Sequence, residues 1–202
     1  QENAINQALE AIAKGKDRIL LTLATGTGKT CIAFQLSWKL FNSRWSLQAA
    51  KNPSNAKKRP RILFLADRNV LTKQAFNDFG AFGEDAVVRI TPSEIKKSKG
   101  VPKNASIFTA IFQTLMTDSA NKHSANVEEI EDEEFEQAVI TDTSNCNFRQ
   151  YPEDFFDFII IDDRENNFDI NDQQLVAALC KRRMGIGADG LILLRNHPSL
   201  DF

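Results

Sequence analysis

The sequence has no apolar run that approaches the roughly 18 residues a membrane-spanning helix needs. Its three cysteines, Cys31, Cys146 and Cys180, are odd in number and widely separated, which predicts neither a disulfide framework nor a cysteine metal site. Residues 1–16 lack the basic start and apolar centre of a secretory signal and indicate an amphipathic helix instead. We therefore expect a reducing, cytoplasmic setting.

A strong overall charge is also missing, because 25 basic and 27 acidic residues leave a formal net charge of -2. The charge is nevertheless uneven, since residues 51–61 and 96–99 are basic and residues 128–136 are acidic. Such runs are most often solvated loops or helix faces, and we interpret all three in that way. With 42% hydrophobic residues in 202 positions, the chain can bury the core of one ordinary domain.

Short apolar runs alternate with helical patterns along most of the chain. The runs are apolar on both faces, which is typical of parallel strands that are covered by helices on each side. We expect five such strands, at residues 18–24, 62–66, 87–90, 106–112 and 156–162, and helices at residues 1–16, 29–41 and 70–79. The polar segment 118–146 is expected to leave the core. The pattern therefore predicts an α/β fold with a parallel sheet.

A glycine-rich loop lies between the first expected strand and the helix that follows it. Small residues there let backbone N–H groups surround phosphates, and the helix presents its positive end to them. Lys29 is the expected contact of the β- and γ-phosphates, and the Thr30 hydroxyl is the expected Mg²⁺ ligand. We predict that ATP is bound by Thr25, Gly26, Thr27, Gly28, Lys29 and Thr30. Leu23 stands where the strict pattern has glycine, so the shorter Gly-x-Gly-Lys-Thr core carries this prediction.

The fifth expected strand is apolar until its last residue, Asp162. A carboxylate in this place is the usual partner of a phosphate loop and holds Mg²⁺. The alternatives are a chance glycine-rich turn and an ordinary strand-end aspartate. The order of strand, loop and helix favours the nucleotide site, and so does the distance of Asp162 along the chain.

Four segments in order, at residues 19–30, 61–71, 109–115 and 151–162, resemble the motor (R) subunit of type I restriction enzymes, a superfamily 2 translocase. The resemblance implies a RecA-like P-loop fold, ATP hydrolysis and movement along double-stranded DNA. It also implies a complex with methyltransferase and specificity subunits, and a role for Gln1 in reading adenine. Contacts to the DNA backbone are implied for strand-end residues, with plain loop chemistry as the alternative: Asp67, Arg68, Asn69, Gln113 and Thr114.

The acidic motif departs from this family. The family reads Asp-Glu-Cys-His, and this chain reads Asp162-Asp163-Arg164-Glu165. Asp163 is one methylene shorter than the glutamate that positions water, and a shift of about 1 Å can cost on the order of a hundredfold in rate. The third motif, the second motor domain and its arginine finger are absent from the sequence. The catalytic candidates are Lys29, Asp162 and Asp163. Because Asp163 is shorter than the family's glutamate and the second motor domain is absent, we expect ATP binding without meaningful hydrolysis.

The last segment, at about residues 161–202, resembles the N-terminal stretch of diaminopimelate epimerase. The phrase RRMGIGADGLILL at residues 182–194 carries most of this resemblance. Cys180 does not stand where the epimerase has a catalytic cysteine, so we expect no epimerase activity. We predict a helix that ends near Arg183, a glycine-rich turn at 185–190 and a short strand at 191–194 of unassigned position. The turn matches a dinucleotide pattern, but the helix precedes it and the strand follows, which is the wrong order.

The chain is therefore interpreted as a chimera, joined near residues 157–162. It consists of a truncated RecA-like domain at residues 1–162 and an epimerase-like fragment at residues 163–202. Two alternatives stay open. One is an isomerase related to diaminopimelate epimerase, and the other is an inactive product whose sheet lacks its last strands and aggregates through an exposed edge.

Overall fold

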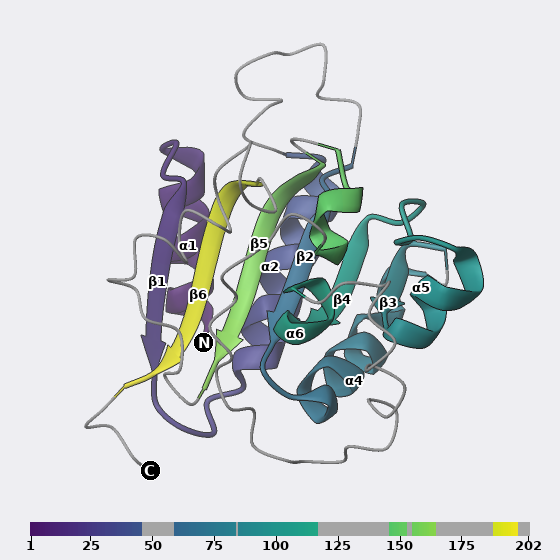
Figure 1. The fold of residues 1–202 in the computed structure, drawn as a ribbon. Helices are drawn as coiled ribbons and strands as arrows, with labels where there is room; N and C mark the ends of the chain where they lie inside the picture. Colours follow the sequence, from purple (N-terminus) through teal and green to yellow (C-terminus); the bar gives the residue numbers. More distant parts are fainter. Residues whose placement is uncertain (46–58, 84, 117–145, 153–154, 165–187, 198–202) are drawn as a thin grey trace.

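The computed structural model describes residues 1–45, 59–83, 85–116, 146–152, 155–164 and 188–197, and these form one parallel sheet with helices on both faces (Figure 1). The strands are β1 (Arg18–Leu23), β2 (Ile62–Ala66), β3 (Val87–Ile90), β4 (Ile107–Ile111), β5 (Phe156–Asp163) and β6 (Ala188–Asn196). Their order in the sheet is β1-β6-β5-β2-β4-β3, and each neighbouring pair is parallel. The predicted α/β class is confirmed.

Two apolar layers hold the helices against the sheet. One face of the sheet packs against α1 (Glu2–Ala13), α2 (Lys29–Ser43), α4 (Asn69–Asp78) and the short helix η2 (Phe79–Phe82). The other face packs against α5 (Pro92–Ser98), α6 (Phe112–Met116) and η4 (Asn147–Gln150). In β2, for example, Phe64 belongs to the first layer, whereas Leu63 and Leu65 belong to the second. Alternate side chains of a strand point to opposite faces, which explains why these strands are apolar throughout.

The local sequence explains where several helices begin. In α1, Ile5, Ala8 and Ile12 recur at helical spacing and are the buried residues of the helix. At the start of α5, the Thr91 side chain accepts a hydrogen bond from the Glu94 backbone N–H, and a proline follows Thr91. This arrangement satisfies an N–H group that the helix itself leaves unpaired.

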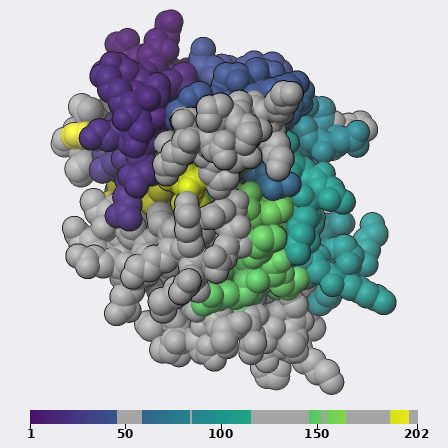
Figure 2. All heavy atoms as spheres, turned by 90° about the horizontal axis from the view of Figure 1, so that it is seen from above, coloured from purple at the N-terminus to yellow at the C-terminus, as the bar shows by residue number. Residues whose placement is uncertain are grey.

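The sixth strand corrects the expectation of five. β6 comes from the tail and lies between β1 and β5, with Arg18 paired to Leu191 and Phe158 paired to Gly190. A view from the amino ends of the strands shows part of this segment, in yellow, between the purple and green segments (Figure 2). Among the described residues, β6 is the only strand that pairs with β1. The strand that leads into the phosphate loop is thus joined to the sheet through the tail.

The tail strand is also longer than expected. It begins at Ala188, so residues 188–190 of the predicted glycine-rich turn are strand. Its apolar residues from Leu191 to Leu194 are at most 7% exposed, and they contribute to both apolar layers. The pairing extends beyond these four residues at both ends, because Ala188 pairs with Phe156 and Asn196 pairs with Leu23. The rest of the turn, the predicted tail helix with Cys180, and residues 118–145 of the predicted excursion lie outside the described residues.

Candidate nucleotide-binding site

The predicted site residues converge at one edge of the sheet. Because all six strands are parallel, their carboxyl ends meet at the same edge, where open sheets of this kind bind ligands. The phosphate loop follows β1 at this edge and leads directly into α2. Asp162 and Asp163 are the last two residues of β5. The fold therefore brings the loop and the two carboxylates together, as the sequence predicts.

The phosphate loop takes a conformation that needs two glycines. Gly26 and Gly28 have φ angles of 76° and 73°, in the left-handed region that other residues rarely adopt. Gly28 is the residue that precedes α2, so Lys29 and Thr30 open the first turn of that helix. The helix amino end is a natural site for an anion, because its first N–H groups have no partner within the helix.

Lys29 is held inside the loop. Its side chain is 3% exposed, and its Nζ donates to the Ala24 carbonyl oxygen at 2.9 Å. The same oxygen accepts from the Thr27 hydroxyl at 2.7 Å. Burial lowers the pKa of Lys29, nearby Asp162 acts in the opposite direction, and the positive charge of Arg164 lowers the pKa further. A phosphate in the loop would offset both unfavourable effects, since its negative charge favours the protonated lysine.

Gln1 lies against the phosphate loop. Its side-chain Nε2 donates to the Thr27 carbonyl oxygen at 2.6 Å, which joins the start of α1 to the loop. A Cβ atom at Gly28 would come within 2.8 Å of the same Nε2 atom. The second glycine therefore serves two purposes, because it allows the left-handed turn and leaves room for the Gln1 amide.

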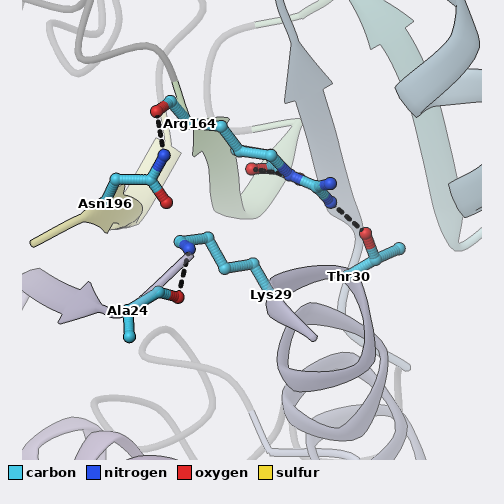
Figure 3. Close-up of polar contacts among 6 residues, drawn as sticks. Ala24, Lys29, Thr30, Arg164 and Asn196 are labelled. Carbon is cyan, nitrogen blue, oxygen red and sulfur yellow. Dashed lines mark hydrogen bonds and ion pairs between the residues drawn. The ribbon is translucent and has the colours of Figure 1, made fainter. Parts of the chain in front are cut away.

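Arg164 was not among the predicted site residues, yet it is central to the site. Its Nε donates to both carboxylate oxygens of Asp162 at 3.0 Å, and its Nη2 donates to Asp162 Oδ2 at 2.8 Å. The same Nη2 lies 2.5 Å from the Thr30 hydroxyl oxygen. Figure 3 shows the guanidinium extending to Thr30 on α2, with Lys29 nearby. The two groups that were predicted to bind Mg²⁺ are thus joined by a guanidinium.

Asp163 has a partner of its own. Arg195 of β6 pairs with Asp163 in the sheet register, and its Nε and Nη2 lie 2.8 and 2.7 Å from Asp163 Oδ2. The aspartate is 4% exposed. The next residue of β6, Asn196, donates from its side-chain amide to the Arg164 carbonyl oxygen. The tail strand therefore contacts the acidic motif at two consecutive residues.

The residues predicted to contact DNA lie after β2 and β4, at the same edge of the sheet. Arg68 and Asn69 are exposed at the start of α4, and Asn69 Oδ1 accepts from Arg89 at 3.3 Å. Gln113 is half-buried in α6, and Thr114 beside it is 3% exposed. Asn147 donates to the Thr114 carbonyl oxygen at 2.7 Å. Arg68 and Asn69 are therefore the more accessible pair.

A phosphate loop between a strand and a helix, with an acidic strand end one strand away at the same edge of a parallel sheet, defines a RecA-like P-loop domain of the kind found in helicases. The chain belongs to the family described as "Type III restriction enzyme, res subunit", whose model matches residues 1–165.

Named relatives support the resemblance to restriction motors. The chain is 35% identical to the type I restriction enzyme EcoAI endonuclease subunit of Escherichia coli, over 81% of this chain and 15% of that protein. A solved fragment described as an HsdR subunit of a type I restriction enzyme from Vibrio vulnificus YJ016 matches with a TM-score of 0.55 and 29% identity. That match covers 96% of this chain and 25% of the solved chain. The chain therefore resembles the motor region of these subunits and spans a small part of their length.

The second predicted resemblance is also confirmed. A stretch of 46 residues is 56% identical to diaminopimelate epimerase of Flavobacterium psychrophilum, and it spans 23% of this chain and 18% of the epimerase. The isomerase alternative gains no further support.

None of the helices among the described residues combines the length and apolar character needed to cross a membrane.

The sequence offered a partial signal for the residues that the predictions missed. Arg164 directly follows the acidic pair, at a position where the restriction motor family has cysteine. The sequence therefore indicated an additional positive charge beside the site. Arg195 and Asn196 lie beyond the apolar run of the tail, and only strand pairing brings them to the site.

Proposed function

We propose that this chain is an ATP-binding motor fragment of a DNA-translocating restriction subunit, and that it binds ATP with little hydrolysis when it is alone. The observation that carries the proposal is the placement of Lys29 and Thr30 in the first turn of α2, opposite Asp162 at the end of β5. Lys29 would contact the β- and γ-phosphates, and the loop N–H groups from Thr25 to Gly28 would surround them. Gln1, already at the loop, would approach the adenine.

The Mg²⁺ that usually accompanies ATP would need the Thr30 hydroxyl and the Asp162 carboxylate. Both are oxygen donors of the kind that Mg²⁺ prefers. Arg164 hydrogen-bonds to both of them, so this arrangement does not fit the ion while the guanidinium is in place. The proposed binding mode therefore rests on Lys29 and the loop, and not on a metal.

The environment of Asp163 supports the proposal of poor hydrolysis. A residue that positions water must offer a carboxylate to that water. The Asp163 carboxylate is buried and paired with Arg195 through β6. Phosphoryl transfer also uses charges that a second motor domain supplies in such enzymes. We therefore propose nucleotide binding as the activity of this chain, with movement along DNA belonging to a longer assembly.

Binding of a fluorescent ATP analogue tests the proposal. The wild-type chain should bind it saturably, and Lys29→Ala should weaken binding by about tenfold or more, because charge-assisted contacts are worth about 1.5–3 kcal/mol. Arg18→Gln is the matched control, since Arg18 is exposed at the opposite end of β1. Equal binding by wild type and Lys29→Ala would refute the assignment of the loop. Steady ATP turnover by the isolated chain would contradict the second half of the proposal.

Double-stranded DNA is the proposed partner of the same edge of the sheet, within a complex that also contains methyltransferase and specificity subunits. Arg68 and Asn69 would contact phosphates without reading sequence. Removing one such contact should reduce the slope of log affinity against log salt by about one unit. Arg68→Gln should show this reduction in a DNA titration at several salt concentrations, and Arg18→Gln should not. An unchanged slope would exclude Arg68 from the interface.

A further inference from the structure

We infer that Arg164 is a resident cation that takes the place of Mg²⁺, so that this chain binds nucleoside triphosphates without a divalent metal ion. The inference rests on the proposed function, because it concerns the same site. Its basis is the bridge that the guanidinium makes between Thr30 and Asp162, which lie 132 positions apart in the sequence and meet at one point in the fold.

The geometry of the bridge leaves little room for an ion between the two ligands. Three hydrogen bonds join Arg164 to the Asp162 carboxylate, and one joins it to the Thr30 hydroxyl. Asp162 is 1% exposed and Thr30 is 5% exposed, so an ion would have to reach both groups inside the site that the guanidinium occupies. A Mg²⁺ ion would have to break these bonds and also lose some of its tightly held water.

The backbone holds Arg164 in this position. The residue directly follows β5, and its carbonyl oxygen accepts a hydrogen bond from Asn196 of β6. The preceding residue, Asp163, is paired with Arg195 of the same strand. Because the tail strand holds both residues, the guanidinium is preorganised at the site and does not need to be recruited by the nucleotide.

The charges support the same role. A buried Asp162 without a cation would repel a triphosphate, and the Arg164 guanidinium neutralises it. Arginine keeps its positive charge at any ordinary pH and presents donors that suit phosphate oxygens. Within the described part of the chain, Arg164 Nη1 makes no hydrogen bond, and the side chain is 32% exposed. Two donors on Nη1 are thus available to a phosphate group. Lys29, which lies across the site from the guanidinium, could contact the same phosphate group (Figure 3).

The test compares binding of a fluorescent ATP analogue in Mg²⁺ and in excess EDTA. The wild-type chain and Arg18→Gln should bind with nearly equal affinity in both buffers. Arg164→Ala should bind at least about tenfold more tightly in Mg²⁺ than in EDTA, because the ion then regains both ligands. Wild-type binding that depends on Mg²⁺ as strongly as binding by Arg164→Ala would overturn the inference. Binding by Arg164→Ala with none by the wild type would also overturn it, since Arg164 would then block the site.

A metal titration without nucleotide separates this inference from the proposed function. Free Mn²⁺, followed by electron paramagnetic resonance, should bind Arg164→Ala at least about tenfold more tightly than the wild type, since the buried carboxylate is then without its cation. Adding Asp162→Asn to Arg164→Ala should remove the gain. If no variant binds ATP, the proposed function fails and this titration still decides the role of Arg164. The inference would be refuted if the wild type and Arg164→Ala bound Mn²⁺ equally and the addition of Asp162→Asn abolished this binding. Mn²⁺ would then occupy the site in the presence of Arg164.

Discussion

The guanidinium of Arg195 lies 2.7 Å from the carboxylate of Asp163, and this ion pair joins the tail strand β6 to the acidic end of β5. The arginine lies in the tail, and the aspartate lies within residues 1–165, which the restriction-enzyme family model matches. The contact is largely buried, since the two side chains are 16% and 4% exposed. The tail strand is therefore joined to β5 by side-chain polar contacts as well as by strand pairing and apolar packing.

We predict that Asp163→Asn destabilises the protein by about 2 kcal/mol. Removing one partner of a buried pair costs about 3–5 kcal/mol, and the partial exposure of Arg195 reduces this loss. Urea denaturation of the two single variants and of Asp163→Asn with Arg195→Gln gives the coupling energy of the pair. Strictly additive losses would show that the pair contributes nothing to stability.

The position of β6 leads to a prediction about the tail. Leu194→Ala should lower the free energy of unfolding by about 2–5 kcal/mol, as expected for a leucine that is fully buried. Leu20→Ala on β1 is the matched control, because Leu20 is 48% exposed and its loss should be clearly smaller. Urea denaturation measures both. Similar losses at the two positions would mean that the tail strand is not part of the cooperative core.

The lowered pKa of Lys29 predicts a pH dependence of ATP binding. Burial and the charge of Arg164 disfavour protonated Lys29. As the pH rises, ATP affinity should therefore begin to decrease before the pH reaches the ordinary lysine pKa of about 10.4. ATP binds the protonated form, and binding in that range should be accompanied by proton uptake. Calorimetry in buffers of different ionisation enthalpy measures the uptake. Lys29→Arg, which stays charged, should bind without uptake, and uptake that persists in this variant would assign it to another group.

The same shift has a consequence for stability without ATP. The unfolded chain, with an ordinary lysine, binds more protons than the folded chain between the lowered and the ordinary pKa. The contribution of Lys29 to stability therefore rises with pH across that window. Lys29→Met should remove this rise in urea denaturation followed as a function of pH, and an unchanged rise would exclude Lys29 as its source.

Tyr151 offers a test of the apolar layer beneath β4. Its hydroxyl donates to the Pro102 carbonyl oxygen at 3.0 Å, and burial raises the pKa of the phenol. Tyr151→Phe should cost about 1 kcal/mol, because it leaves the Pro102 oxygen without its donor. Tyr151→Leu should cost more, since the ring also packs edge to face on Phe108. Equal losses in urea denaturation would assign the whole effect to the hydroxyl.

The sequence alone determined the local parts of this protein. Apolar runs predicted β1 to β5, and glycines before Lys29 predicted the loop and the start of α2. These features depend on neighbouring residues, because strand periodicity, helix starts and left-handed turns are all encoded over a few positions. Asp162 was predicted at the correct edge of the sheet, because parallel strands place their carboxyl ends together.

Only the tertiary structure decided where the tail strand lies and what surrounds the acidic motif. An apolar run shows that a strand is buried, but its pairing partners lie far away in the sequence, so β6 could not be placed between β1 and β5 in advance. The bridge from Arg164 to Thr30 depends on that placement, as does the pairing of Asp163 with Arg195. The local sequence thus determines which elements form, whereas long-range pairing determines which charges meet.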